Sequence, residues 1–233
     1  MKQSTSNFKV IGHRGAAALD PENTLRSFAR AVREGVDGIE FDVQYIDGRA
    51  LVLHDDTLNR TSNGSGPANS FTFEKLREFD FGLGERIPTL AEAVDSIPSN
   101  ILVNVELKSE NSALASYEVL CDFSSHRFLV SSFRVSELEA FARVAQGQEN
   151  LRLAVLHLGL DDAVLHNAKS LGASAICLCD PFVRGETVNA VRDSGYELYV
   201  FTVNSLNRAR QLMGLGASGV ITDNPNKINS DSL

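Results

Sequence analysis

The chain has 233 residues, of which 43% are hydrophobic and 22% are charged. This length suits one domain, and the hydrophobic content excludes an intrinsically disordered protein. Asp and Glu outnumber Lys and Arg by 30 to 22, and the resulting net charge of −8 argues against a nucleic-acid partner, which needs a basic face. A phosphorylated small molecule is still compatible with this charge, because a few local cations and a metal ion can override the overall field.

The N-terminal segment 1–9 is polar, so we expect no signal peptide, and no apolar run approaches the length of a membrane span. The three cysteines lack the spacing of a zinc site, which favours reduced thiols and a cytoplasmic location. Cys177 and Cys179 lie two residues apart in an apolar run, so we expect both to face the core from one side of a strand.

Apolar runs alternate with helical patterns along the whole chain. Such near-continuous apolar runs are typical of parallel strands that are covered on both faces. The predicted strands, in chain order, are 8–12, 38–43, 101–106, 127–131, 153–157, 175–178, 198–203 and 219–222. Eight strands alternating with helices predict a closed (β/α)8 TIM barrel spanning residues 1–233, with an open doubly wound sheet as the alternative.

A segment at about residues 45–87 interrupts this repeat. It begins with a turn (46–49) and a returning antiparallel strand (50–54), continues through a short helix (72–78), and leads to a helix that Thr89 caps (90–96). Long excursions of this kind in compact domains are usually functional. We therefore predict a small cap, inserted after the second strand, over one rim of the barrel.

Three carboxylates occur where predicted strands end, which is where barrel enzymes carry their functional side chains. Glu40 and Asp42 are two residues apart and share one face of their strand, while Glu106 ends the next predicted parallel strand. Buried carboxylates are costly unless a cation compensates them, and oxygen ligands suit Mg²⁺ or Ca²⁺ better than zinc. We therefore predict one divalent cation on these residues. The alternative is that each carboxylate pairs with a nearby Lys or Arg.

Two histidines, His13 and His54, also lie at predicted strand ends. Either one alone could be a structural, hydrogen-bonded histidine. Together they supply the two proton transfers that phosphodiester cleavage needs, one from the attacking hydroxyl and one to the leaving alkoxide. Arg14 and Lys108 are predicted to hold the non-bridging phosphate oxygens.

The chain closely resembles the glycerophosphodiester phosphodiesterases, and the resemblance covers nearly its whole length. The matching segments, all in order, are 12–15 (GHRG), 21–24 (PENT), 40–43 (EFDV), 54–61 (HDDTLNRT), 88–90 (PTL), 104–108 (NVELK), 131–133 (SSF), 201–204 (FTVN) and 219–225 (GVITDNP). The short chain and polar N-terminus resemble the cytoplasmic bacterial members.

This resemblance implies a barrel with an insertion after the second strand, a divalent ion on Glu40, Asp42 and Glu106, and catalysis by His13 and His54. It implies hydrolysis of a small-molecule glycerophosphodiester to sn-glycerol 3-phosphate and an alcohol such as choline or ethanolamine. In that scheme the free hydroxyl of the glycerol attacks phosphorus, and water opens the resulting cyclic phosphate.

The family motifs also suggest where four further residues lie. Glu22 is expected near the metal or Arg14, and Asn23 is expected either there or as a helix cap. Phe201 stands where many members carry Trp, and we place it with Phe133 in the substrate pocket, which leaves the preferred alcohol open.

Two other functions use similar machinery. A lysophospholipase D would need an apolar surface for lipid contact, and the candidates are Phe71, Phe73, Phe79 and Phe81, which are more simply packing residues of the cap. A phosphate-sensing barrel would not need two groups placed for proton transfer. We expect no stable membrane association, and a homo-oligomer is one option.

Overall fold

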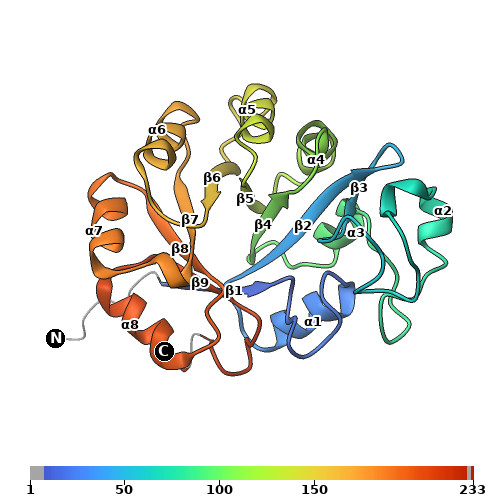
Figure 1. Cartoon of the computed structure of the whole chain (residues 1–233), viewed down its shortest axis with the longest axis horizontal. Helices are drawn as coiled ribbons and strands as arrows, with labels where there is room; N and C mark the ends of the chain where they lie inside the picture. Colours follow the sequence, from blue (N-terminus) through green and yellow to red (C-terminus); the bar gives the residue numbers. More distant parts are fainter. Residues whose placement is uncertain (1–7, 230–231) are drawn as a thin grey trace.

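The computed structural model describes residues 8–229 and 232–233, so the prediction about segment 1–9 falls largely outside the described residues. Eight parallel strands form a closed ring (Figure 1). They are β1 (Lys9–His13), β2 (Gly38–Ile46), β4 (Leu102–Leu107), β5 (Arg127–Ser132), β6 (Leu151–His157), β7 (Ala175–Cys179), β8 (Glu197–Phe201) and β9 (Gly219–Thr222). β1 closes the ring by pairing with both β2 and β9. The predicted barrel is confirmed, and the open-sheet alternative is wrong.

Helices follow the strands and cover the outside of the ring (Figure 1). They are α1 (Leu25–Arg33), α3 (Leu90–Asp95), α4 (Ser112–Leu120), α5 (Val135–Val144), α6 (Asp162–Ser170), α7 (Gly185–Asp193) and α8 (Leu206–Leu215). Gly216 ends α8 in the left-handed conformation, with φ 95°, which glycine adopts without steric cost. Within the described part of the chain, no helix has both the length and the apolar character needed to cross a bilayer.

Side chains alternate between the two faces of each strand, and this alternation builds two apolar layers. In β2, Ile39, Phe41 and Val43 point outward into the large core between the barrel and the helices. A smaller cluster fills the barrel interior: Ile11, Leu102, Leu129, Ala154, Leu156, Ala175, Cys177, Tyr199 and Ile221. Cys177 is fully buried as predicted, but Cys179 is only partly buried because it ends β7.

The insertion after β2 forms a cap with its own core, at the right of Figure 1. It contains β3 (Arg49–Val52), which pairs antiparallel with β2, the short helix η1 (Ala68–Ser70) and α2 (Phe73–Leu76). Its buried side chains are Ile46, Leu51, Leu53, Leu58, Ala68, Leu76, Phe81 and Ile87, with Phe71, Phe73 and Phe79 packed against them. The packing role predicted for the four phenylalanines is therefore confirmed. Thr89 caps α3 as predicted, and the structure adds a reciprocal hydrogen bond to the Glu92 side chain that completes a capping box.

Candidate active site

The three predicted carboxylates meet inside the barrel at the C-terminal ends of its strands. The register pairs Asp42 of β2 with Glu106 of β4. Glu40 lies two residues before Asp42 on β2, so its side chain also points into the barrel. One oxygen from each carboxylate lies within 4.8 Å of the other two. Glu40 and Asp42 are almost completely buried, and the Glu106 side chain is 12% exposed.

Burial of these carboxylates has an electrostatic consequence. Removal from water, followed by the charge of Asp42, raises the pKa of both Glu40 and Glu106. The cluster therefore needs added positive charge to ionise fully at neutral pH. Three convergent oxygen donors without a histidine or cysteine fit a hard divalent cation such as Mg²⁺ or Ca²⁺.

Two cations already face the cluster. Lys108 Nζ lies 2.8 Å from Glu106 Oε1 and 3.5 Å from Asp42 Oδ1, and Arg14 Nε lies 3.2 Å from Asp42 Oδ2. Burial opposes the charge on each cation, but the neighbouring carboxylates outweigh it, so the pKa of both Arg14 and Lys108 is raised. The alternative of simple ion pairing thus holds for Asp42 and Glu106. Glu40 instead accepts a backbone hydrogen bond from Arg14 at 3.0 Å.

His13 is oriented by a carboxylate from the other end of the chain. Its Nδ1 donates to Oδ1 of Asp223 at 2.6 Å, and Asn204 Nδ2 donates to the second oxygen of Asp223 at 2.6 Å. The other ring nitrogen, Nε2, lies 3.9 Å from Glu40 Oε2. Burial lowers the pKa of His13, but the hydrogen bond to Asp223 and the charge of Glu40 outweigh burial, and the net shift is upward.

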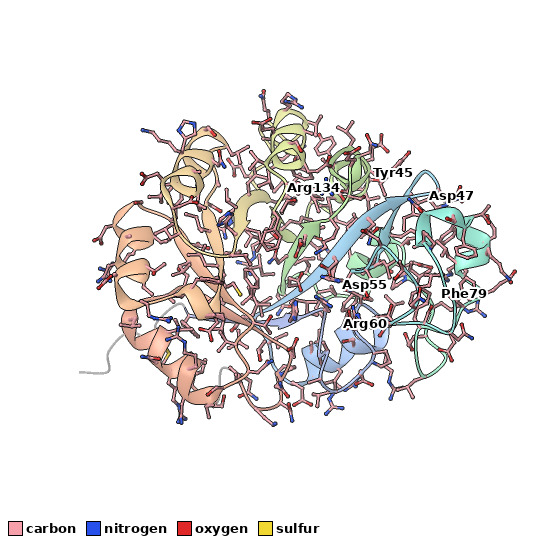
Figure 2. All side chains as sticks on the ribbon, in the orientation of Figure 1. Tyr45, Asp47, Asp55, Arg60, Phe79 and Arg134 are labelled. Atoms are coloured by element: carbon pink, nitrogen blue, oxygen red, sulfur yellow. The ribbon has the colours of Figure 1, made fainter. Side chains whose placement is uncertain are left out.

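His54 follows β3 and is held by a similar contact on the cap side of the site. Its Nδ1 donates to Asp55 Oδ1 at 2.6 Å. Arg60 lies beside Asp55 (Figure 2) and donates from Nε to Oδ2 at 2.8 Å. The hydrogen bonds from Arg60 lower the pKa of Asp55 well below its usual range. Arg60 also contacts Glu22 at 2.7 Å, and Glu22 contacts Arg14 at 2.6 Å. A chain of alternating charges therefore links His54 to the carboxylate cluster.

Two cavities adjoin the carboxylates, and His13 borders both. The smaller, about 20 Å³, is lined by His13, Glu40, Asn104, Glu106, Ser131, Leu156, Phe201 and Ile221. The larger, about 470 Å³ and more polar, is lined by His13, Arg14, Ala17, Ala18, Glu22, Asn204, Asp223 and Asn224. Phe133 stands edge-to-face against Phe201, with ring centroids 6.1 Å apart. The site thus has a narrow pocket with a partly apolar wall beside an open polar hollow.

The sequence pattern of the glycerophosphoryl diester phosphodiesterase family matches residues 13–227. A glycerophosphodiester phosphodiesterase of Caldanaerobacter subterraneus is 34% identical over 93% of this chain and 94% of its own length. One from Bacillus altitudinis is 31% identical over 94% of this chain and 96% of its own. The chain belongs to the glycerophosphoryl diester phosphodiesterase family.

Solved structures of this family agree with the barrel. A phosphodiesterase of Oleispira antarctica, in complex with the product sn-glycerol 3-phosphate, superimposes with a TM-score of 0.88 at 30% identity and covers 94% of both chains. A glycerophosphodiester phosphodiesterase of Agrobacterium tumefaciens gives a TM-score of 0.81 at 25% identity, covering 94% of this chain and 97% of its own. The predicted family, and with it the prediction of an enzyme, is confirmed.

Most residues predicted for a phosphodiesterase site of this family lie together. Glu40, Asp42, Glu106, Arg14 and Lys108 form one contact network that His13 adjoins, while Phe133 pairs with Phe201 at the small pocket. His54 lines neither cavity and joins this network only through its neighbours.

For Glu22 and Asn23, the sequence had left two possible positions open. Glu22 lies beside Arg14, which is one of the two places expected for it. Asn23 is not a helix cap: Thr24 caps α1, and Asn23 Nδ2 donates to Asp42 Oδ2 at 2.9 Å. Asn23 has φ 58°, a left-handed conformation that points its amide toward the carboxylates instead.

Several polar residues of the site had no predicted role: Asp55, Arg60, Asn104, Ser131, Asn204 and Asp223. One signal was available for Asp223, because it directly follows the last predicted strand. Asn104 interrupts an apolar run at an inward position, which is the same signal that indicated Glu106.

Proposed function

We propose that this chain hydrolyses glycerophosphodiesters to sn-glycerol 3-phosphate and an alcohol, with one bound Mg²⁺ or Ca²⁺. The observation that carries the proposal is the meeting of three buried carboxylates, two cations and a carboxylate-oriented histidine at one rim of the barrel. Glycerophosphodiesters as the substrate class are supported by the sn-glycerol 3-phosphate bound to the Oleispira protein and by the name of the Caldanaerobacter relative, a glycerophosphodiester phosphodiesterase.

Glu40, Asp42 and Glu106 would hold the cation. When bound, it would polarise a phosphoryl oxygen and stabilise the negative charge that develops there. Arg14 and Lys108 would hold the non-bridging oxygens, because both already direct nitrogen atoms toward the rim where the phosphate would sit.

His13 and His54 would move the protons, one accepting from the attacking glycerol hydroxyl and the other donating to the leaving alkoxide. Each has its Nδ1 engaged by an aspartate, so each presents Nε2 for the transfer. Phe133 and Phe201 would form the apolar wall of the substrate pocket. The barrel and its cap would act as one domain, because His54 and Arg60 of the cap reach the barrel's Glu22 and Arg14.

The substrate would be a small molecule, with neither nucleic acid nor a membrane as a stable partner. The carboxylates of the site outnumber its cations, and the chain as a whole is acidic, which disfavours a polyanion. Lysophospholipids are not favoured, because the cap phenylalanines pack in or against the cap core, which gives them a structural role that needs no lipid partner. The free thiols of Cys121, Cys177 and Cys179 fit a cytoplasmic enzyme.

The deciding experiment measures glycerol 3-phosphate release from glycerophosphocholine by protein stripped with EDTA and then supplied with Mg²⁺, Ca²⁺ or no cation. We expect activity only with a cation, and little turnover of lysophosphatidylcholine under the same conditions. Full activity of metal-stripped His13→Ala protein would disprove the proposal. Release of glycerol and phosphocholine instead would show cleavage of the other ester bond, and so a different reaction.

A further inference from the structure

We infer that Asn104 is a specificity-determining residue whose amide binds the terminal hydroxyl of the substrate's glycerol moiety, in the small pocket beside the carboxylates. This inference rests on the proposed function and names the part of the substrate that each cavity takes. Asn104 lies on β4, two residues before Glu106, and points into the barrel.

The Asn104 amide has a hydrogen-bond partner for its oxygen but none for its nitrogen. Its Oδ1 accepts a hydrogen bond from the Ser131 hydroxyl at 2.9 Å, and both residues are buried. Its Nδ2 has no acceptor, although the side chain is fully buried. Buried amide donors are nearly always paired in folded proteins, so an unpaired donor on a residue that lines a pocket calls for an oxygen acceptor.

The residues around the pocket narrow the identity of that acceptor. Glu40 and Glu106 line the same pocket, yet neither accepts from Nδ2. A bound cation cannot be the partner of Nδ2, because an amide N–H group is a hydrogen-bond donor and does not ligate metals. An incoming oxygen atom from the substrate is therefore the group that Nδ2 fits.

The size and lining of the pocket select which substrate oxygen enters. Its volume of about 20 Å³ holds roughly one water-sized group. β4 and β8 lie four strands apart around the eight-stranded ring, so Asn104 faces Phe201 across it, with Leu156 and Ile221 completing an apolar wall. A hydroxymethyl group offers a CH₂ to that wall and an oxygen to Asn104. A phosphate or a choline group is too large.

The larger hollow then takes the leaving alcohol. Its volume of about 470 Å³ accommodates head groups of different sizes, and it adjoins the small pocket at His13. Asn104 would thus recognise the glycerol side of the diester, and the larger hollow would receive the alcohol side.

The test measures binding by calorimetry, on the full chain with Mg²⁺, of sn-glycerol 3-phosphate and of its 1-deoxy analogue, a propane-1,2-diol phosphate of the same configuration. The analogue lacks only the terminal hydroxyl. We expect wild-type protein to bind it about tenfold to a hundredfold more weakly, because the analogue leaves Nδ2 unpaired.

Asn104→Ala should weaken binding of sn-glycerol 3-phosphate by a similar factor and leave binding of the analogue nearly unchanged. Asn104→Ser, which still offers an oxygen to Ser131, serves as a second variant if the alanine protein folds poorly. The matched control is Ser116→Ala, which removes another buried, unpartnered polar atom, but from α4. It should retain the wild-type preference.

Equal binding of the two ligands by wild-type protein, binding of neither, or equal weakening of both by Asn104→Ala would each overturn the inference. Hydrolysis of glycerophosphocholine is measured separately on the same preparations. Hydrolysis together with equal ligand binding refutes only the role of Asn104. A clear preference for sn-glycerol 3-phosphate without hydrolysis supports that role and refutes only the proposed catalytic function.

Discussion

The imidazole Nδ1 of His13 lies 2.6 Å from Oδ1 of Asp223, although the two residues are 210 positions apart in the chain. β1 and β9 are neighbours in the ring, so the first strand supplies the histidine and the loop after the last strand supplies the carboxylate. A carboxylate that accepts from Nδ1 holds one tautomer and one ring orientation, and therefore directs Nε2 toward the carboxylate cluster.

Replacing Asp223 with Asn should impair the chemical step. The amide can hold His13 in the wrong tautomer, so we expect kcat to fall by about a hundredfold to ten-thousandfold, the range of general acid–base catalysis, with a much smaller change in KM. Steady-state kinetics on glycerophosphocholine measure this. Asp180→Asn is the control, because Asp180 follows β7 at the same end of the barrel but pairs with Arg208 at 2.7 Å. Unchanged kcat in Asp223→Asn would contradict the orienting role.

Replacing Arg60 with Lys should make the orientation of the His54 ring less fixed, because Arg60 holds the Asp55 carboxylate that accepts from it. Arg60 uses its forked guanidinium to contact Asp55 and Glu22 together, and a lysine cannot reproduce that geometry. We expect kcat to fall by about tenfold, a modest loss because the side chain is 47% exposed and its ion pairs are partly screened. Arg77→Lys, which alters a similar pair between the cap and Glu92 of α3, should keep nearly full activity. The idea fails if both variants lose activity equally.

Cation binding should release a proton at neutral pH. Burial and the charge of Asp42 raise the pKa of Glu40 to about 8 in the cation-free protein, and a cation displaces that proton. The affinity for Mg²⁺ or Ca²⁺ should therefore rise with pH up to about 8, by at most about tenfold per pH unit for one proton. Calorimetry in buffers of different ionisation enthalpy counts the protons. Glu40→Gln should release fewer, and equal release would contradict the assignment.

The same shift gives the cation-free protein a pH-dependent stability of definite sign. The unfolded chain loses the Glu40 proton near 4.5, whereas the folded chain keeps it up to about 8. Between these values the unfolded state binds fewer protons, so Glu40 lowers the free energy of unfolding as the pH rises. Denaturant titrations should show this slope weaken in Glu40→Gln and in the cation-loaded protein. A slope that is the same in all three proteins would rule Glu40 out as its cause.

Glu137 should matter for stability and not for chemistry. It lies buried on α5, and its carboxylate accepts from the backbone amides of Asn111 and Ala113 at 3.2 and 2.8 Å, at the N-terminus of α4. Glu137→Ala leaves both donors unpaired, which should lower the free energy of unfolding by about 2–4 kcal/mol. Chemical denaturation measures this. Glu139→Ala, an exposed position on the same helix, should cost far less, and an equal loss would contradict the capping role.

The strands could be predicted closely because parallel barrel strands are apolar on both faces. The prediction of 175–178, for example, differs from β7 by one residue. The predicted strand ends were less accurate where pairing with another strand, and not the apolar composition, determines where a strand ends. β2 runs to Ile46, beyond the predicted 43, because its last residues pair with β3. β3 itself ends at Val52, so His54 lies in the following loop.

The carboxylates could be predicted because alternation along one strand is a local property. Glu40 and Asp42 share a face of β2, and the register then pairs Asp42 with Glu106. The contact between His13 and Asp223 has no local signature, since only ring closure brings those residues together. Asn104 is visible in the sequence as a polar interruption of an apolar run, but its unpaired Nδ2 is a property of the folded barrel that the sequence pattern does not report.

Ring closure through β1 and β9 also fixes when the site can form during protein synthesis. The carboxylates lie between positions 40 and 106, so a nascent chain holds all three well before it contains β9. The aspartate that orients His13 is made only after all the strands of the ring. A ribosome-bound chain arrested before Gly219 should therefore be inactive even if its earlier strands have collapsed, and activity should appear only after the last strand has left the ribosome.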